Sequence, residues 1–176
     1  CPFALYEEDP LLFFNWHCRN NLCGGNTELY KFDQLVKTEF IRTKVKPGVC
    51  SVFHSDPGNG KSSVHGVNQN GPGVYPRIFQ GYWQTFQSID DALNSFNYHS
   101  KGKLWAVFED ANPNQGARNN EKFKSIISDG SLNFTSKGKD TKEYVDNRMN
   151  LIHSQRADCV KTEPGCRRFV FHACDN

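Results

Sequence analysis

The sequence lacks a long apolar run, a strong net charge and, with one exception, methionine. No segment approaches the roughly 18 consecutive apolar residues of a membrane-spanning helix, so we expect no membrane partner. A formal net charge of +2 at pH 7 is too small to indicate a nucleic-acid partner by itself. Fourteen Gly and eight Pro argue against a helical bundle, because both residue types favour turns. With 176 residues, of which 13% are aromatic, we expect a single domain, residues 1–176, around an aromatic core.

Cysteine is absent between Cys50 and Cys159, so the cysteines gather towards the two ends of the chain. The positions are Cys1, Cys18, Cys23, Cys50, Cys159, Cys166 and Cys174. Their spacings fit zinc poorly, so we expect disulfides that close the fold, with one cysteine unpaired and the connectivity open. Disulfides indicate an oxidising compartment. We therefore expect a secreted, extracellular protein with no metal site and no cofactor.

Two further features agree with secretion. A chain that begins at Cys1 is typical of a mature product from which a signal peptide has been removed. Asn133 opens the sequence Asn-Phe-Thr, which is an acceptor for N-glycosylation in a polar stretch. We expect a glycan at Asn133.

Hydrophobic periodicity predicts both helices and strands. Apolar residues at steps of three and four predict a helix over residues 27–43 with Asn26 or Thr27 as its N-cap, and Ser88 is predicted to cap a second helix. Further helices are predicted at 120–128 and 140–155, and strands at 11–16, 49–54, 75–86, 104–108 and 168–173. These elements predict an α+β fold with three or four helices, and we expect disulfides to close it.

The loop of residues 55–73 carries a partial phosphate-binding motif. Lys61 and Ser62 follow Gly60 as the pattern GxxxxGK[ST] requires, and a predicted strand precedes them. Ser55, however, stands at the first glycine position, and the sequence SVHGVNQNGPG after Ser62 does not predict the helix that would hold an anion. We interpret the segment as a turn. Asp56 and Asn59 offer too few oxygen ligands for calcium.

Several polar residues on predicted strands suit phosphodiester chemistry, which needs an acid, a base and a cation for the phosphate. They are His54, Arg77, Glu109, Arg118 and His172. The order Tyr-Pro-Arg, LWAVFE, GAR and FVFHAC resembles the secreted fungal guanyl-specific ribonucleases. The resemblance covers residues 73–118 and 168–174, and it implies one helix packed on a twisted antiparallel sheet. With the helices predicted above, we expect an α+β fold in which a twisted antiparallel sheet is flanked by three or four helices and closed by disulfides.

The resemblance also implies residue roles. Tyr75 and Arg118 would contact phosphate, and His172 would be the general acid. Arg77 stands where the family has a catalytic His, and Leu104 precedes Trp105 where the family has Glu. A base would then have to come from His54 or Glu109, with Arg77 holding phosphate.

These departures favour a catalytically degenerate effector over an active ribonuclease, acting on a host or competitor with RNA or a host protein as its partner. In such effectors an aromatic-x-Cys motif near the N-terminus is bonded to a C-terminal cysteine, which implies a bond between Cys18 and Cys174 here. Two alternatives stay open. One is a secreted hydrolase or toxin with its site in residues 55–73. The other is a glycan- or polyanion-binding module built on the following cations and aromatics: Lys101, Lys103, Arg167 and Arg168 with Tyr82, Trp83 and Trp105.

Overall fold

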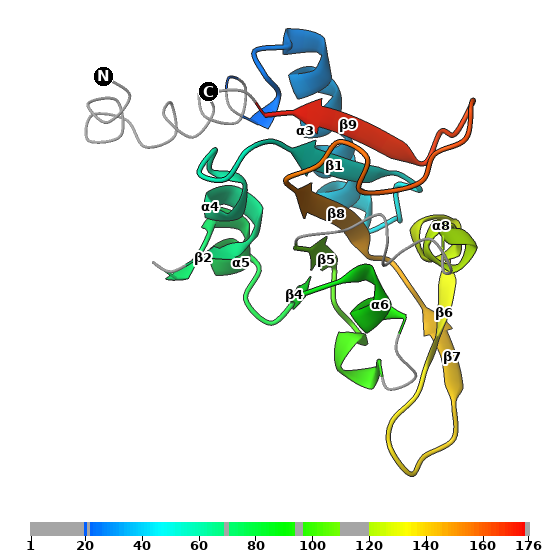
Figure 1. Ribbon diagram of the computed structural model, residues 1–176. Coiled ribbons are helices and arrows are strands. Elements are labelled where there is room, and N and C mark those ends of the chain that lie inside the picture. Colours follow the sequence, from blue (N-terminus) through cyan, green and yellow to red (C-terminus); the bar gives the residue numbers. More distant parts are fainter. Residues whose placement is uncertain (1–19, 21, 69–70, 94–96, 110–119, 175–176) are drawn as a thin grey trace.

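The centre of the molecule is a five-stranded sheet in which every pairing is parallel. The computed structural model describes residues 20, 22–68, 71–93, 97–109 and 120–174. The strand order is β4-β5-β8-β1-β9 (Figure 1). The strands are β4 (Trp83–Phe86), β5 (Trp105–Phe108), β8 (Met149–Ser154), β1 (Cys50–His54) and β9 (Phe169–Ala173). The predicted antiparallel sheet is therefore wrong.

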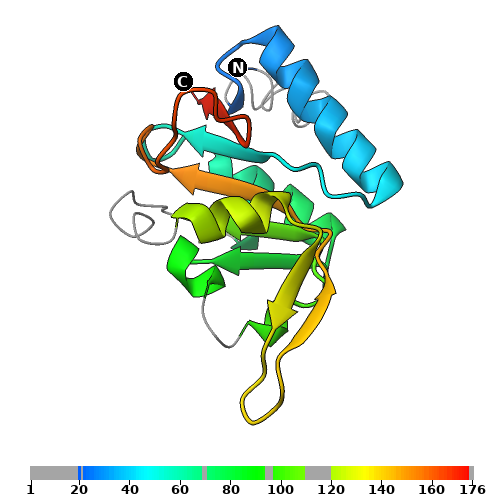
Figure 2. The same ribbon diagram turned by 90° about the vertical axis from the view of Figure 1, so that its right-hand side faces the viewer.

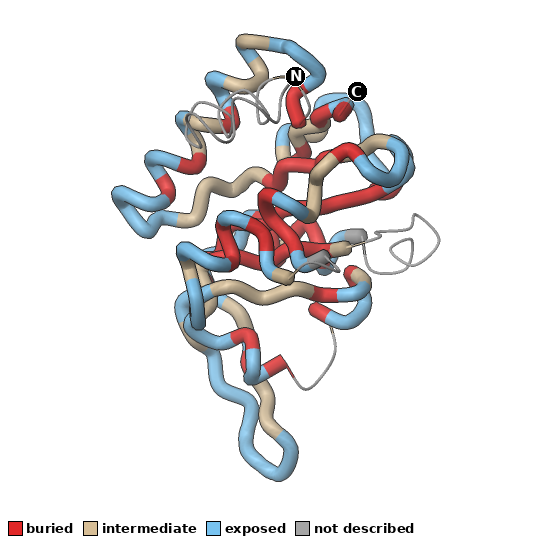
Figure 3. Tube along the Cα trace, turned by 90° about the vertical axis from the view of Figure 1, so that its left-hand side faces the viewer, coloured by how far each residue is buried: buried red, intermediate tan, exposed pale blue. Residues whose placement is uncertain are grey.

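Helices cover both faces of this sheet, as the crossovers between parallel strands require. On one face the strands pack against α6 (Ile89–Ala92) and α8 (Asn120–Ser128) through Phe86, Phe108 and Phe123. On the other they pack against α3 (Thr27–Thr43), α4 (Lys61–His65) and α5 (Val74–Ile78). Figure 2 shows α8 in front of the sheet with α4 and α5 behind it, and Figure 3 shows that buried residues concentrate in the strands.

The helices with strong local signals were predicted correctly. Asn26 caps α3, its side chain accepting a hydrogen bond from the Leu29 amide at 3.0 Å. Ser88 caps α6 by accepting from the Asp91 amide at 3.2 Å. The predicted helix at 120–128 is α8, and β1, β5 and β9 occupy three of the predicted strands. The strand predicted at 11–16 lies outside the described residues.

Two predicted elements are wrong. Residues 75–86 form α5 and then β4, because Gly73 begins a helix in which Pro76 lies within the first turn. Residues 140–155 form β7 (Lys142–Val145) and β8 instead of a helix. All six residues of β8 are buried, so the strand has apolar side chains on both faces. The spacing of these apolar residues also matches the period of a helix, which explains the wrong prediction.

The described cysteines form no disulfide bond. The Cys50 and Cys159 thiols are buried in the core, and burial raises the pKa of both. The Cys174 thiol donates to the Leu22 carbonyl at 3.3 Å. Cys1 and Cys18, and with them the expected bond to Cys174, lie outside the described residues. The disulfide-closed fold is wrong for the described part, and the inference of secretion loses that support; the extracellular location itself stays a prediction.

An antiparallel hairpin projects from one end of the sheet (Figures 1 and 2). It consists of β6 (Ser131–Phe134) and β7, and it holds the predicted glycosylation residue Asn133 in a strand. At its base, buried Asp146 contacts Lys46 Nζ and Arg148 Nε, each at 2.7 Å. Burial raises the pKa of Asp146, but the hydrogen bonds and charges of Arg148 and Lys46 outweigh burial and lower it. The ion cluster anchors the hairpin to the body of the protein.

Among the described residues, no helix is both long and apolar enough to cross a membrane. Nothing in the structure tests the prediction of a single domain.

Candidate functional site

The loop between β1 and α4 is closely folded. Gly58 and Gly60 have φ values of +92° and +76°, a region that favours glycine. Asn59 is buried, and its Nδ2 donates to the Cys174 carbonyl at 2.8 Å. The Ser55 amide donates to the Ser154 carbonyl at 3.2 Å. These contacts tie the loop to the carboxyl ends of both strands that flank β1.

A helix does follow the loop, but an insertion interrupts it. After α4 the chain forms a small hairpin of β2 (Val67–Asn68) and β3 (Gly71–Pro72) and then enters α5. The Gly73 amide donates to the Gly66 carbonyl at 2.9 Å, which joins the two ends of the insertion. A Cβ atom on Gly73 would lie 2.6 Å from the Ser63 carbonyl oxygen, so this close approach requires glycine.

Lys61 and Ser62 direct polar groups along the loop and towards β5. The Lys61 ammonium donates to the Ser55 carbonyl at 3.1 Å, to Ser55 Oγ at 2.6 Å and to the Asp56 carbonyl at 3.1 Å. The Ser62 hydroxyl lies 3.5 Å from Glu109 Oε2. At the start of α4 the Ser62 hydroxyl thus lies close to the carboxylate that follows β5, and the Lys61 ammonium contacts oxygens of the loop.

Glu109 follows β5 directly, and its side chain is 17% exposed. Its two carboxylate oxygens lie 3.3 and 3.2 Å from Nδ1 of His153, which comes from the neighbouring strand β8. Because all five strands are parallel, Glu109 and the loop after β1 meet at one edge of the sheet. In open parallel sheets, ligands bind outside this carboxyl edge.

Beneath the loop lies a buried polar cluster between α3 and α4. Lys37 Nζ contacts Asp33 Oδ2 at 2.5 Å and His65 Nε2 at 2.9 Å. The His65 ring stacks on Phe53 with centroids 4.9 Å apart. Among the described residues, no group of three or more His, Cys, Asp or Glu side chains is arranged to hold a metal ion.

The structure separates the residues singled out for phosphodiester cleavage. Glu109 and half-buried His54 lie at the carboxyl edge of the sheet, whereas His172 is fully buried and stacked on Phe53 at 4.4 Å. Tyr75 is also buried. Arg77 is exposed on α5, and its Nε donates to the Pro72 carbonyl at 2.7 Å. Arg118 lies outside the described residues.

Several residues of the site were missed in the sequence. They are Lys37, His65, Gly66 and His153, whereas Asn59 was considered only as a calcium ligand. Two signals do point to the site: the sequence GKS directly after a strand, and the apolar run WAVF that ends in Glu109. His153 carries no local signal, because its role depends on the pairing of β8 with β5.

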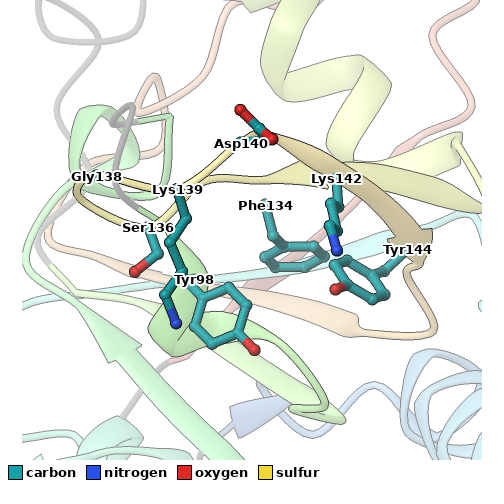
Figure 4. A pocket seen from close by; sticks show the side chains of 8 residues that line it. All are labelled: Tyr98, Phe134, Ser136, Gly138, Lys139, Asp140, Lys142 and Tyr144. Atoms are coloured by element: carbon teal, nitrogen blue, oxygen red, sulfur yellow. The ribbon is translucent and has the colours of Figure 1, made fainter.

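A second concave surface lies at the β6–β7 hairpin and has a volume of about 400 Å³. Figure 4 shows its lining residues: Tyr98, Phe134, Ser136, Gly138, Lys139, Asp140, Lys142 and Tyr144. Tyr98 belongs to the short helix η2 (Tyr98–Ser100) and is 45% exposed. The Lys101 ammonium lies 3.6 Å from the centroid of the Tyr144 ring. The surface therefore combines aromatic rings with several lysines.

Comparison with solved structures finds the same fold in the C-terminal region of NrS-1. Its apo structure, covering residues 305–718, matches with a TM-score of 0.79 and 19% identity over 92% of this chain. Two A-form apo structures of that region match with TM-scores of 0.76 and 0.75 and identities of 19% and 20%. The chain spans only 37–38% of these neighbours.

These findings overturn the interpretation as a secreted ribonuclease-like effector, hydrolase or toxin, because the fold is parallel and the resemblance is to a different protein. No curated protein matches the chain. The model of a family of unknown function, DUF5906, matches residues 53–168, which is more than half of the chain. The match includes the last two residues of β1, the loop after it, Glu109 and His153. The chain therefore belongs to the DUF5906 family.

Proposed function

We propose that the chain is a nucleoside triphosphatase domain that binds its substrate at residues 55–62. One observation carries the proposal: the GKS sequence follows a parallel strand, turns into α4 and places Ser62 Oγ 3.5 Å from Glu109. In phosphate-binding loops of this type, backbone amides surround the phosphates, and the lysine reaches the β- and γ-phosphates. Ser55 replaces the first glycine of the motif.

The side chains have distinct roles in this proposal. Lys61 would exchange its contacts with the loop oxygens for contacts with the triphosphate. Ser62 would contact the magnesium ion, whose preference for oxygen ligands suits a hydroxyl beside phosphates. The ion would neutralise charge on the phosphates. Glu109 would orient the attacking water and accept its proton.

Replacing Glu109 with Gln tests this assignment. The amide keeps the size of the side chain but cannot accept the proton, so hydrolysis should fall by about 100-fold or more. Nucleotide affinity should stay within about threefold, because Lys61 and the loop are unchanged. Hydrolysis is measured as phosphate release from ATP, GTP, CTP and UTP with magnesium, and binding by competition with a fluorescent ATP analogue.

Glu28→Gln provides a matched control, because Glu28 is 82% exposed in the first turn of α3. It should leave both measurements unchanged. If the folded wild-type protein binds none of the four nucleotides in the presence of magnesium, the proposal is wrong.

The hairpin surface favours a second function, binding of single-stranded nucleic acid. Aromatic rings stack on bases while lysines contact the backbone phosphates, and this combination needs no base-specific contacts. Tyr98 and Tyr144 supply rings, and Lys139 and Lys142 supply cations around them. In the sequence, an RNA partner was predicted from other residues, through the resemblance to ribonucleases. The support for nucleic-acid binding here is the aromatic and basic composition of the hairpin surface.

We expect Tyr98→Ala to weaken the binding of oligo(dT) and oligo(rU) by roughly tenfold, as the loss of one stacking contact implies. Lys139→Ala should reduce the slope of log affinity against log salt by about 0.7, the contribution of one phosphate contact. Phe32→Ala is the control, because Phe32 is 42% exposed on α3 and does not line the hairpin surface. Fluorescence anisotropy measures all three. Equal affinity of Tyr98→Ala and wild type would contradict this function.

A further inference from the structure

A buried histidine faces the carboxylate to which the proposed mechanism assigns water activation. His153 has a side chain that is only 2% exposed, and its Nδ1 lies within 3.3 Å of both carboxylate oxygens of Glu109. We propose that His153 is a positioning residue, which holds the Glu109 carboxylate in the orientation that hydrolysis requires. This inference rests on the proposed function of the site.

The sheet register brings the two side chains together. Phe108 pairs with Ile152 in the parallel ladder of β5 and β8, so the next residue along each strand is Glu109 and His153. An ionised carboxylate only accepts hydrogen bonds, and therefore Nδ1 must carry the proton that it donates. His153 Nε2 is buried, and no described group hydrogen-bonds to it. The polar contact of the ring is thus directed at Glu109.

Packing fixes the orientation of the His153 ring. The Phe53 ring meets it edge-on with centroids 6.0 Å apart, and the His65 ring lies 5.7 Å away. His65 is in turn fixed by the Lys37 ammonium, which is paired with Asp33. The residues that contact the ring therefore come from β1 and α4, and α3 holds His65 in place, so the ring has little freedom to turn.

The backbone at Gly66 limits the positions open to the Glu109 carboxylate from another direction. A Cβ atom on Gly66 would lie 2.2 Å from Glu109 Oε1 and 2.9 Å from Ser62 Cβ. Gly66 has a φ value of −116°, which other residues adopt readily, so the close approach accounts for glycine here better than backbone strain does. The carboxylate is therefore constrained both by a hydrogen bond and by a tight fit.

Three substitutions at His153 test the proposal. His153→Leu removes the donor, whereas His153→Asn keeps an N–H group close to the position of Nδ1. His153→Gln moves the amide farther out, near the position of Nε2. A misplacement of about 1 Å in an active site costs roughly 100-fold in rate. We expect His153→Leu and His153→Gln to lower kcat by 10- to 100-fold, with nucleotide Kd within threefold, and His153→Asn to stay within fivefold of wild-type kcat.

The double variant supplies a readout that a purely structural role would not change. In the Glu109→Gln background, His153→Leu should not lower the residual rate further, because the carboxylate that His153 positions is already absent. Thermal unfolding checks that each variant is folded. If His153→Leu does not fold, the comparison of the Asn and Gln variants decides.

The two proposals fail in different ways. Wild-type protein that does not hydrolyse nucleotide contradicts the proposed function itself. Wild-type protein that hydrolyses nucleotide, with equal kcat in the folded Asn and Gln variants, contradicts the role of His153 alone. A further loss of rate on combining His153→Leu with Glu109→Gln also contradicts that role.

Discussion

Replacing Lys61 with Ala is expected to weaken magnesium–ATP binding by about 100-fold or more and to bring hydrolysis below detection. The Lys61 ammonium makes three hydrogen bonds to oxygens of its own loop. In the proposed complex the same group would contact phosphate oxygens instead. Truncating one partner of a hydrogen-bonded charge pair costs roughly 2–5 kcal/mol, and about 2.7 kcal/mol corresponds to 100-fold in affinity. Isothermal titration calorimetry measures the binding directly.

Two comparisons make this result specific. Lys122→Ala removes an exposed lysine from α8 and should leave binding unchanged, because α8 packs on the sheet face opposite α4. Lys61→Arg should restore little affinity, because a planar guanidinium is larger than the compact ammonium that the loop encloses. Nucleotide affinity in folded Lys61→Ala equal to that of wild type would contradict the assignment of the loop.

Local signals allowed part of this fold to be predicted. The N-terminal ends of α3 and α6 were predicted because Asn26 and Ser88 cap amides three residues further along the chain. The run WAVF was predicted as a strand because all four residues of β5 are apolar, and the structure buries them all. Such features depend on neighbours in sequence, which the sequence displays directly.

Strand direction depends on distant contacts and was predicted wrongly. The neighbours of β1 are β8 and β9, which lie about 100 residues further along the chain. A fully apolar strand such as β5 is typical of parallel sheets, where both faces are covered, and this reading would have argued against an antiparallel sheet. The antiparallel direction came instead from the resemblance to the guanyl-specific ribonucleases.

The partial phosphate-binding motif of residues 55–62 was recognised in the sequence but interpreted as a turn, for two local reasons. Ser55 replaces the first glycine, yet among the described residues other than glycine only Lys44 has a positive φ, so the structure does not require glycine at position 55. Helix α4 was not predicted because it has only five residues before the β2–β3 hairpin separates it from α5. Gly66 and Gly73, which resemble loop residues in the sequence, are packed at the junction.

His172 shows how burial can reverse an interpretation. The resemblance to the ribonucleases implied that His172, on the predicted strand of residues 168–173, is a general acid. β9 is an edge strand, but His172 lies on its covered face with its Nδ1 3.6 Å from Cys23 Sγ. Burial lowers the pKa of His172 from 6.5 to about 4, with nearby Lys37 and His54 contributing in the same direction and Asp33 opposing them. The side chain is therefore neutral at physiological pH.

This shift predicts that acid destabilises the fold through His172. In the unfolded chain the imidazole has a pKa near 6.5, so between pH 6.5 and 4 the unfolded state binds more protons than the folded state. The contribution of His172 to stability is therefore fully present above pH 6.5 and is lost as the pH falls towards 4. A shift of this size corresponds to about 3 kcal/mol over the whole window, and to about 2 kcal/mol at pH 5.

His172→Phe isolates this contribution, because a Phe ring can also stack on Phe53 and does not titrate. Urea unfolding at pH 7.5 and pH 5.0 should show the free energy of unfolding of the wild type falling by about 2 kcal/mol more than that of the variant. The other histidines and the carboxylates titrate in both proteins, so their effects cancel in the difference. Equal losses of unfolding free energy in the two proteins would mean that the His172 imidazole is already protonated in the folded state at pH 5.0. Water or a hydrogen-bond acceptor would then have to reach the covered face of β9.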